Sequence, residues 1–307
     1  MITASAPGMI VLFGEHAVVY GEMALATAIN KRVNVTATEL DTRSIVVESK
    51  NLGRTFEGPL YGETNEPVIR AVQGALERTG KSRGIGISID SSIPVGVGMG
   101  SSASVSVATA AAVLQLLQDD FDLIDVCTIA YEAEKVVHGN PSGIVNTIAT
   151  FGGTISFKQG TIEGIDSKVL SFVVGNTGIP RNTSTMVEKV KKHIEDPVMA
   201  HSLFNIGAIA WKAKEALASR NLNEIGQLMN KNHEFLRNLG VSSPELEVLV
   251  EAAKDAGAYG AKLAGAGGGG IMIALTEHAQ DVIKALKEKG ATAFKVKTNQ
   301  QGVKIEE

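Results

Sequence analysis

Residues 94–104, PVGVGMGSSAS, combine three glycines with a pair of serines. Glycine has no Cβ, so backbone N–H groups can approach an anion closely and the chain can adopt positive φ. Ser101 and Ser102 lie where a helix would begin, and a helix N-terminus offers unpaired N–H groups and the positive end of its dipole. The segment therefore predicts a phosphate site. Taken alone, it also fits a tight loop capped by serine, so the flanking motifs must decide.

Two better-known phosphate motifs are excluded. The loop lacks the G-K-[ST] ending of a Walker P-loop. Residues 265–270, GAGGGG, match G-x-G-x-x-G formally, but the strand-like segment IMIAL follows where a dinucleotide-binding fold requires a helix. A glycine run between two strands instead predicts a hairpin that packs against another loop or a ligand.

The expected elements mix helices with strands. Strands are expected at 33–39, 44–49, 86–90, 153–158, 168–174, 260–264, 271–275 and 292–297. Helices are expected at 66–79, 101–117, 122–138, 182–193, 197–217, 221–236, 244–256 and 277–289. Because helices and strands do not alternate strictly, an α+β fold is favoured over a doubly wound parallel sheet. The 307 residues fit two packed domains, which we place at 1–170 and 171–307.

Charge and cysteine content narrow the class of protein. A net charge of -4 provides no basic field for nucleic acid or an anionic membrane. Cys127 is the only cysteine, which excludes an internal disulfide and favours a reducing compartment. Since neither a signal peptide nor a bilayer-spanning stretch is evident, we expect a cytoplasmic enzyme that acts on a small molecule. The apolar segments 105–117 and 244–256 fit either a core or a homodimer interface. His233 has no motif around it and is expected at the surface.

Three separated segments resemble, in order and spacing, the signature motifs of the GHMP kinases. They are SAPGMIVLFGEHAVVYG at 5–21, PVGVGMGSSA at 94–103 and KLAGAGGGG at 262–270. GEHAVVYG within the first of them, HGNPSGI at 138–144 and PRNT at 180–183 resemble the mevalonate kinases of that family more closely than galactokinases or homoserine kinases. The resemblance implies an N-terminal domain like ribosomal protein S5 domain 2, a ferredoxin-like C-terminal domain and an active site between them. It also implies ATP with Mg²⁺ as cofactors and mevalonate or a related alcohol as the acceptor, phosphorylated to 5-phosphomevalonate in isoprenoid biosynthesis.

The resemblance also implies roles for individual residues. Ser101 and Ser102 match serines that contact phosphate and Mg²⁺, and Glu134 matches the carboxylate that holds the metal. Glu15 and His16 match a pair that shapes the substrate end of the cleft. Hydroxyl, carboxylate and phosphate oxygens are the ligands that Mg²⁺ prefers. From the residues alone, Glu134 also fits a solvated helix carboxylate and His16 a core histidine. The other positions expected to bind nucleotide are Pro94, Gly96, Gly98, Gly100, Ala103, Gly267 and Gly268.

The chain departs from the family's pattern on the acceptor side. Met9 and Val145 stand where mevalonate kinases have their catalytic lysine and aspartate, and Ala264 replaces a threonine that contacts substrate. All three changes replace a polar residue by an apolar one, while the nucleotide-side motifs are intact. Three interpretations stay open: a silenced or redesigned enzyme with weak or lost activity, a kinase for a less polar alcohol, or a nucleotide-binding protein without turnover. Met9 and Val145 also fit plain core packing.

Overall fold

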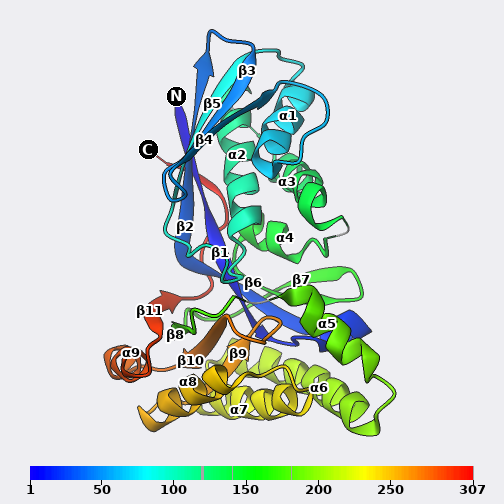
Figure 1. Cartoon of the computed structure of the whole chain (residues 1–307), viewed down its shortest axis with the longest axis vertical. Coiled ribbons are helices and arrows are strands. Elements are labelled where there is room, and N and C mark those ends of the chain that lie inside the picture. The colour runs from blue at the N-terminus through cyan, green and yellow to red at the C-terminus, as the bar shows by residue number, and fades with distance from the viewer. Residues whose placement is uncertain (119–120, 140, 181, 307) are drawn as a thin grey trace.

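A computed structural model describes residues 1–118, 121–139, 141–180 and 182–306. Of the motif residues named above, Asn140, Arg181 and the side chain of His138 lie outside this description. The molecule is elongated, with one sheet and its helices above a second sheet and its helices, and both chain ends lie beside the upper sheet (Figure 1).

The first sheet has eight strands in the order β12-β1-β2-β5-β3-β4, with β6 paired to β2 and β7 paired to β6. Neighbouring strands are antiparallel except for the parallel pair β3 and β5. The strands are β1 (Ile2–Phe13), β2 (Ala24–Leu40), β3 (Ser44–Ser49), β4 (Arg54–Pro59), β5 (Gly84–Ser91), β6 (Thr154–Lys158), β7 (Thr161–Ile165) and β12 (Lys304–Glu306). The upper half of β2 pairs with β5 and its lower end with β6. The two longest strands, β1 and β2, therefore run from the upper part of this sheet down to the second sheet and its helices (Figure 1).

Four helices pack on one face of this sheet (Figure 1). They are α1 (Pro67–Thr79), α2 (Ser101–Gln118), α3 (Leu123–His138) and α4 (Ile144–Phe151). The central helix α2 is rich in alanine and serine and lies against β1, β2 and the other three helices. Within the described residues, α2 is the one helix long and apolar enough to cross a membrane, but 67% of it is buried inside the chain itself. This burial is what a core helix requires.

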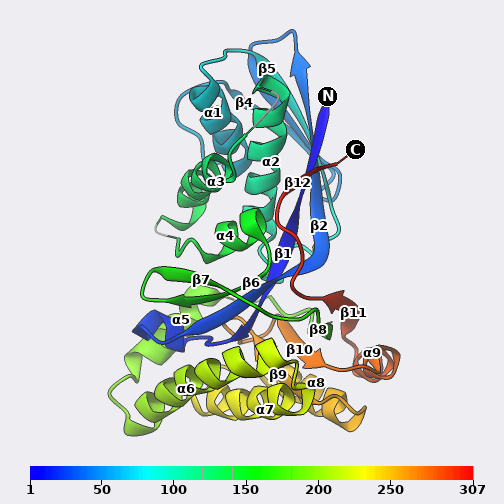
Figure 2. The ribbon, with the colours of Figure 1, turned by 180° about the vertical axis from the view of Figure 1, so that it is seen from behind.

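The second sheet has four antiparallel strands in the order β11-β8-β10-β9. They are β8 (Ser171–Asn176), β9 (Gly260–Ala264), β10 (Ile271–Leu275) and β11 (Thr292–Lys297). Helices α6 (Pro197–Ser219), α7 (Leu222–Asn238) and α8 (Pro244–Asp255) lie below the sheet, whereas α9 (Ala279–Glu288) lies at its β11 side and α5 (Thr183–Lys192) lies on the opposite side (Figures 1 and 2). Every residue of β9 and β10 is buried. The predicted α+β class is confirmed.

Some elements differ from the sequence-based expectation. The first half of the first motif lies in strand β1, and residues 144–151 form a short helix, for neither of which an element was expected. The last strand, β12, returns to the first sheet, and Arg32 anchors this return by donating to the carbonyl oxygens of Ser5 at 2.8 Å and Gly302 at 2.7 Å. The boundary between residues 170 and 171 stays a prediction, and β8 begins at Ser171.

Candidate active site

The glycine loop is fixed from below by two buried side chains. Val97 and Met99 are buried in the core, whereas Gly96, which precedes Val97, and Gly98, which lies between the two, are exposed. The carbonyl of Met99 accepts a hydrogen bond from the N–H of Met9 at 2.9 Å, which joins the loop to β1. All three loop glycines have φ between 76° and 78°, a conformation that favours glycine. Because buried side chains alternate with glycines, Gly96 and Gly98 face outward. Pro94 lies at the start of the loop.

Helix α2 begins directly after this loop and carries a polar pair at its first turn. The Ser102 hydroxyl donates to Glu134 Oε1 at 2.8 Å. Glu134 lies on α3 and is 6% exposed, so it is not the solvated helix carboxylate that the residues alone also allowed. Among the described residues, no group of three or more His, Cys, Asp or Glu side chains is placed to hold a metal. A metal at the Ser102–Glu134 pair would therefore need further oxygens, such as those of a bound phosphate. Ala103, next in the helix, is buried.

A cavity of about 340 Å³ opens beside the loop and is lined by Gly96, Ser101 and Ser102. Its opposite wall comes from the segment between β3 and α1. There Asn51 donates to the Ser91 carbonyl at 2.9 Å and accepts from the Ser91 N–H at 2.6 Å. On the same wall Arg54 lies 4.9 Å from the centre of the Phe56 ring and 3.2 Å from Glu66. No sequence motif marks this wall, so its residues could not be predicted to line a site.

Met9 and Val145 meet at the last glycine of the loop. A Cβ added at Gly100 would lie 2.7 Å from Val145 Cγ1 and 3.0 Å from Met9 Cγ. Met9 is 5% exposed, and both side chains belong to an apolar cluster with Ala26 and Ile155. The two substituted positions thus lie side by side at the phosphate loop. Val145 is placed there by helix α4, which the sequence did not predict.

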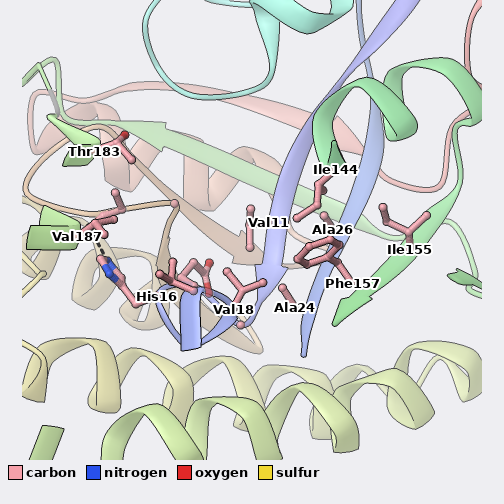
Figure 3. A pocket seen from close by; sticks show the side chains of 15 residues that line it. Val11, His16, Val18, Ala24, Ala26, Ile144, Ile155, Phe157, Thr183 and Val187 are labelled. Atoms are coloured by element: carbon pink, nitrogen blue, oxygen red, sulfur yellow. Dashed lines mark hydrogen bonds between the residues drawn. The ribbon is translucent and has the colours of Figure 1, made fainter. Parts of the chain in front are cut away.

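A second cavity, of about 190 Å³, lies beyond this cluster (Figure 3). Its walls are almost entirely apolar, formed by residues such as Val11, Ala24, Ala26, Ile144, Ile155 and Phe157. Glu15 and His16 come from the turn after β1 and lie at its polar end. The His16 Nε2 lies 2.9 Å from the carbonyl oxygen of Ala266, to which it can donate (Figure 3). Burial lowers the pKa of His16, so its ring is neutral at pH 7.

Glu15 forms a buried ion pair with Lys262 that joins the first sequence motif to the third. The two side chains are 1% and 0% exposed, and Lys262 Nζ donates to Glu15 Oε1 and to the Leu263 carbonyl. Burial lowers the pKa of Lys262, while the neighbouring carboxylate opposes that shift. Glu15 Oε2 has no hydrogen-bond partner among the described residues. This oxygen is a polar group that a ligand donor would satisfy.

The predicted glycine hairpin is present between β9 and β10. Ala264 ends β9, pairs with Ile271 and is buried in the core, so of this motif only the turn residues line the second cavity. A Cβ at Gly267 would lie 2.1 Å from the Val241 carbonyl oxygen, and one at Gly268 would lie 2.9 Å from Met186 Sδ. Gly267 is therefore required by close packing on the Val241 backbone, whereas at Gly268 the positive φ of 72° favours glycine.

His233 supports strand β9 from below and is buried, which corrects the expectation that it lies at the surface. Its Nδ1 accepts from the Leu263 N–H at 3.3 Å, and its Nε2 lies 3.0 Å from Glu247 Oε1. Burial lowers the pKa of His233 from 6.5 to about 4; Glu247 opposes this shift, whereas Lys262 and Arg237 add to it. The ring is thus held neutral within a charged neighbourhood.

This burial predicts a loss of stability in acid. Between the two pKa values the unfolded chain binds a proton at His233 that the folded chain resists, so the free energy of unfolding falls as the pH falls. From about pH 7.5 to about pH 4.5 this residue alone should remove about 2.5 kcal/mol. Urea unfolding of the wild type and of His233→Gln at both pH values measures it. Equal pH dependence in the two proteins would contradict the assignment.

Comparison with known proteins agrees with this architecture. The sequence model for the GHMP kinases N-terminal domain matches residues 66–153, and that for the GHMP kinases C-terminal domain matches residues 213–292. The chain therefore belongs to the GHMP kinases, a family of small-molecule kinases, and within that family it is of the mevalonate kinase type.

Relatives that match over their full length support the assignment to the mevalonate kinase type. The chain is 39% identical to the mevalonate kinase of Pyrococcus abyssi, over 100% of this chain and 98% of the relative, and 34% identical to that of Aeropyrum pernix, over 99% and 98%. The crystal structure of the Methanococcus jannaschii mevalonate kinase is similar with a TM-score of 0.88 and 26% identity, covering 97% of this chain and 98% of that one. The L. major mevalonate kinase in complex with R-mevalonate is similar with a TM-score of 0.84 and 28% identity, covering 97% and 96%.

Proposed function

We propose that the glycine loop and the N-terminus of α2 bind the phosphates of ATP. The observation that carries this proposal is the Ser102–Glu134 pair, with its 2.8 Å separation, directly beside the outward-facing glycines. Backbone N–H groups of the loop and first helical turn would donate to phosphate oxygens. The 340 Å³ cavity next to Gly96 and Ser101 would take the nucleoside.

The same pair suits Mg²⁺. Ser102 Oγ and Glu134 Oε1 are hard oxygen ligands that lie 2.8 Å apart, close enough for one metal ion to bind both. Mg²⁺ is usually held by one or two carboxylates together with substrate phosphates. When bound, the ion neutralises charge on the phosphoryl group during transfer. Glu134 would fix the position of that charge, while the buried base of the loop excludes water from one side.

The proposed reaction is transfer of the terminal phosphoryl group of ATP to the hydroxyl of mevalonate or a related alcohol. Met9 and Val145 offer no group that can take the hydroxyl proton or stabilise charge. Only positioning and the metal then accelerate the reaction, and loss of a general base commonly costs about 10²–10⁴-fold in rate. We further propose that the protein is cytoplasmic and acts without nucleic acid or membrane. A homodimer through α8 stays a prediction; on this helix the apolar side chain of Val248 is 48% exposed.

The test is steady-state ADP formation from ATP and Mg²⁺, with and without mevalonate, measured in parallel with the Pyrococcus abyssi relative. We expect mevalonate-dependent turnover that needs Mg²⁺ and is slower than the relative's by about 10²–10⁴-fold. Turnover equal to the relative's would show that the lysine and aspartate replaced here by Met9 and Val145 are dispensable. Nucleotide binding with no alcohol-dependent ADP would instead leave a nucleotide-binding protein.

A further inference from the structure

We propose that the preferred acceptor is a neutral, branched alcohol of about five carbons, whose carbon chain occupies the cavity between β1, β2, β6 and α5. The inference rests on the proposed kinase function and names the substrate class of the same site. It follows from three properties of the cavity: its apolar lining, the apolar cluster that joins its wall to the phosphate loop, and its charge.

The lining is apolar on several sides at once. Figure 3 shows Val11, Ala26 and Ile144 close together at one end of the cavity, with Phe157 beside them. These side chains come from β1, β2, α4 and β6, so a ligand would be surrounded by carbon rather than lie on a flat patch. Burial of apolar ligand surface in such a site is favourable by the hydrophobic effect.

The wall of the cavity adjoins the residues beside the phosphate loop. The cluster that contains Met9 and Val145 also contains Val11, Ile144 and Ile155, and these last three line the cavity. An apolar wall therefore runs from Gly100 of the phosphate loop into the cavity. A hydroxyl at the loop end of a ligand would leave its hydrocarbon chain along this wall.

The charges at the polar end disfavour a carboxylate ligand such as mevalonate. Lys262 is already paired with Glu15, and the unpartnered Oε2 of Glu15 would face an incoming anion. His16 is neutral and already bonded to Ala266. Of the lining residues that the structure describes, none is a lysine or an arginine. Among these described lining residues, an ionised carboxylate would find no free cation, and such a burial is costly in an apolar site.

The volume of the cavity suits a small acceptor. At roughly 30 Å³ for a water-sized group, 190 Å³ holds a body of about six heavy atoms, as in a branched five-carbon alcohol. In the proposed step, the alcohol oxygen forms a bond to the γ-phosphorus while the bond from that phosphorus to the β,γ-bridging oxygen breaks. ADP leaves with the electron pair, the hydroxyl proton passes to solvent, and a phosphate monoester is the product.

The experiment compares 3-methylbut-3-en-1-ol, 3-methylbutan-1-ol and mevalonate as acceptors, with ATP and Mg²⁺. Phosphate esters are identified by phosphorus NMR, and kcat/KM is obtained from ADP release. We expect kcat/KM for the neutral alcohols to exceed that for mevalonate by about 10-fold or more, since the lost pairing of one buried charged group has at least that effect. A preference for mevalonate, or equal use of both classes, would overturn the inference.

Two cavity variants separate the acceptor class from the kinase function. Val11→Thr keeps the shape but adds a hydroxyl, and should lower kcat/KM for the neutral alcohols by about 3–10-fold. Ala26→Leu should fill the cavity and lower it further. The matched control is Val198→Thr, at an exposed position on α6 outside the lining of the cavity. Titration with ADP and Mg²⁺ checks that each variant is folded.

The outcomes distinguish the two claims. Intact nucleotide binding with no effect of Val11→Thr or Ala26→Leu on the neutral alcohols would overturn the assignment of the cavity and leave the nucleotide site standing. Intact nucleotide binding with no turnover of any neutral alcohol would also overturn it. A wild-type protein that binds no nucleotide would overturn the proposed function itself.

Discussion

Replacing Met9 by lysine and Val145 by aspartate together should raise kcat for mevalonate by about 10²–10⁴-fold, the usual contribution of a general base with its supporting charge. Met9 and Val145 both lie next to Gly100, so the two new charges would lie close together beside the phosphate loop. A lysine there also offers a cation to an anionic acceptor. The variant should therefore gain mevalonate turnover while losing affinity for a neutral alcohol.

The single variants are the internal controls for that result. Met9 is 5% exposed, so Met9→Lys or Val145→Asp alone places an uncompensated charge in an apolar cluster and should unfold at a lower temperature than the double variant. An apolar double variant, Met9→Leu with Val145→Ile, should leave the mevalonate rate low. A charged double variant that folds and binds nucleotide but gains no mevalonate turnover would contradict the assignment of these two positions.

Glu134→Gln should lower kcat/KM for the alcohol acceptor by about 10²-fold or more, because the amide carries no charge to hold Mg²⁺ against the phosphates. Gln keeps the size of the side chain and an oxygen to accept from Ser102. The fold should therefore persist, and the defect should be relieved in part at high Mg²⁺ concentration.

The matched control is Glu132→Gln, two residues earlier on the same helix. Its side chain is 44% exposed and forms an ion pair with Lys135 at 2.6 Å. Loss of such a surface pair has a small effect on stability and should leave turnover unchanged. Equal activity of Glu134→Gln and wild type over a Mg²⁺ titration would remove Glu134 from the site.

The nucleotide side could be predicted from the sequence because its signals are local. Glycines that must be glycine, as at Gly100 with its positive φ, and serines at a helix start leave a readable pattern over a few residues. The hairpin after Ala264 was predictable for the same reason, since a strand follows the glycine run. The identity of Ser102 and Glu134 as a pair, in contrast, rested on resemblance, because 32 residues separate them.

The acceptor side depends on contacts that the sequence does not show. Helix α4 has only eight residues and follows Gly143 in a left-handed conformation, so tertiary packing decides its existence. Phe157 on β6 and Val187 on α5 reach the cavity from segments with no motif. The short β12 forms because Arg32 and β1 hold the returning chain, and its three residues carry no signal of their own.

The central claim is that the Ser102–Glu134 pair beside the glycine loop makes a Mg²⁺-dependent nucleotide site in this chain. Isothermal titration of ADP into the purified protein, with Mg²⁺ and with a chelator, tests it most directly. We predict one binding event per chain that weakens when Mg²⁺ is removed and loses that dependence in Glu134→Gln. A folded wild-type protein that releases no binding heat in either condition, and shows no thermal stabilisation by ADP, would contradict the claim.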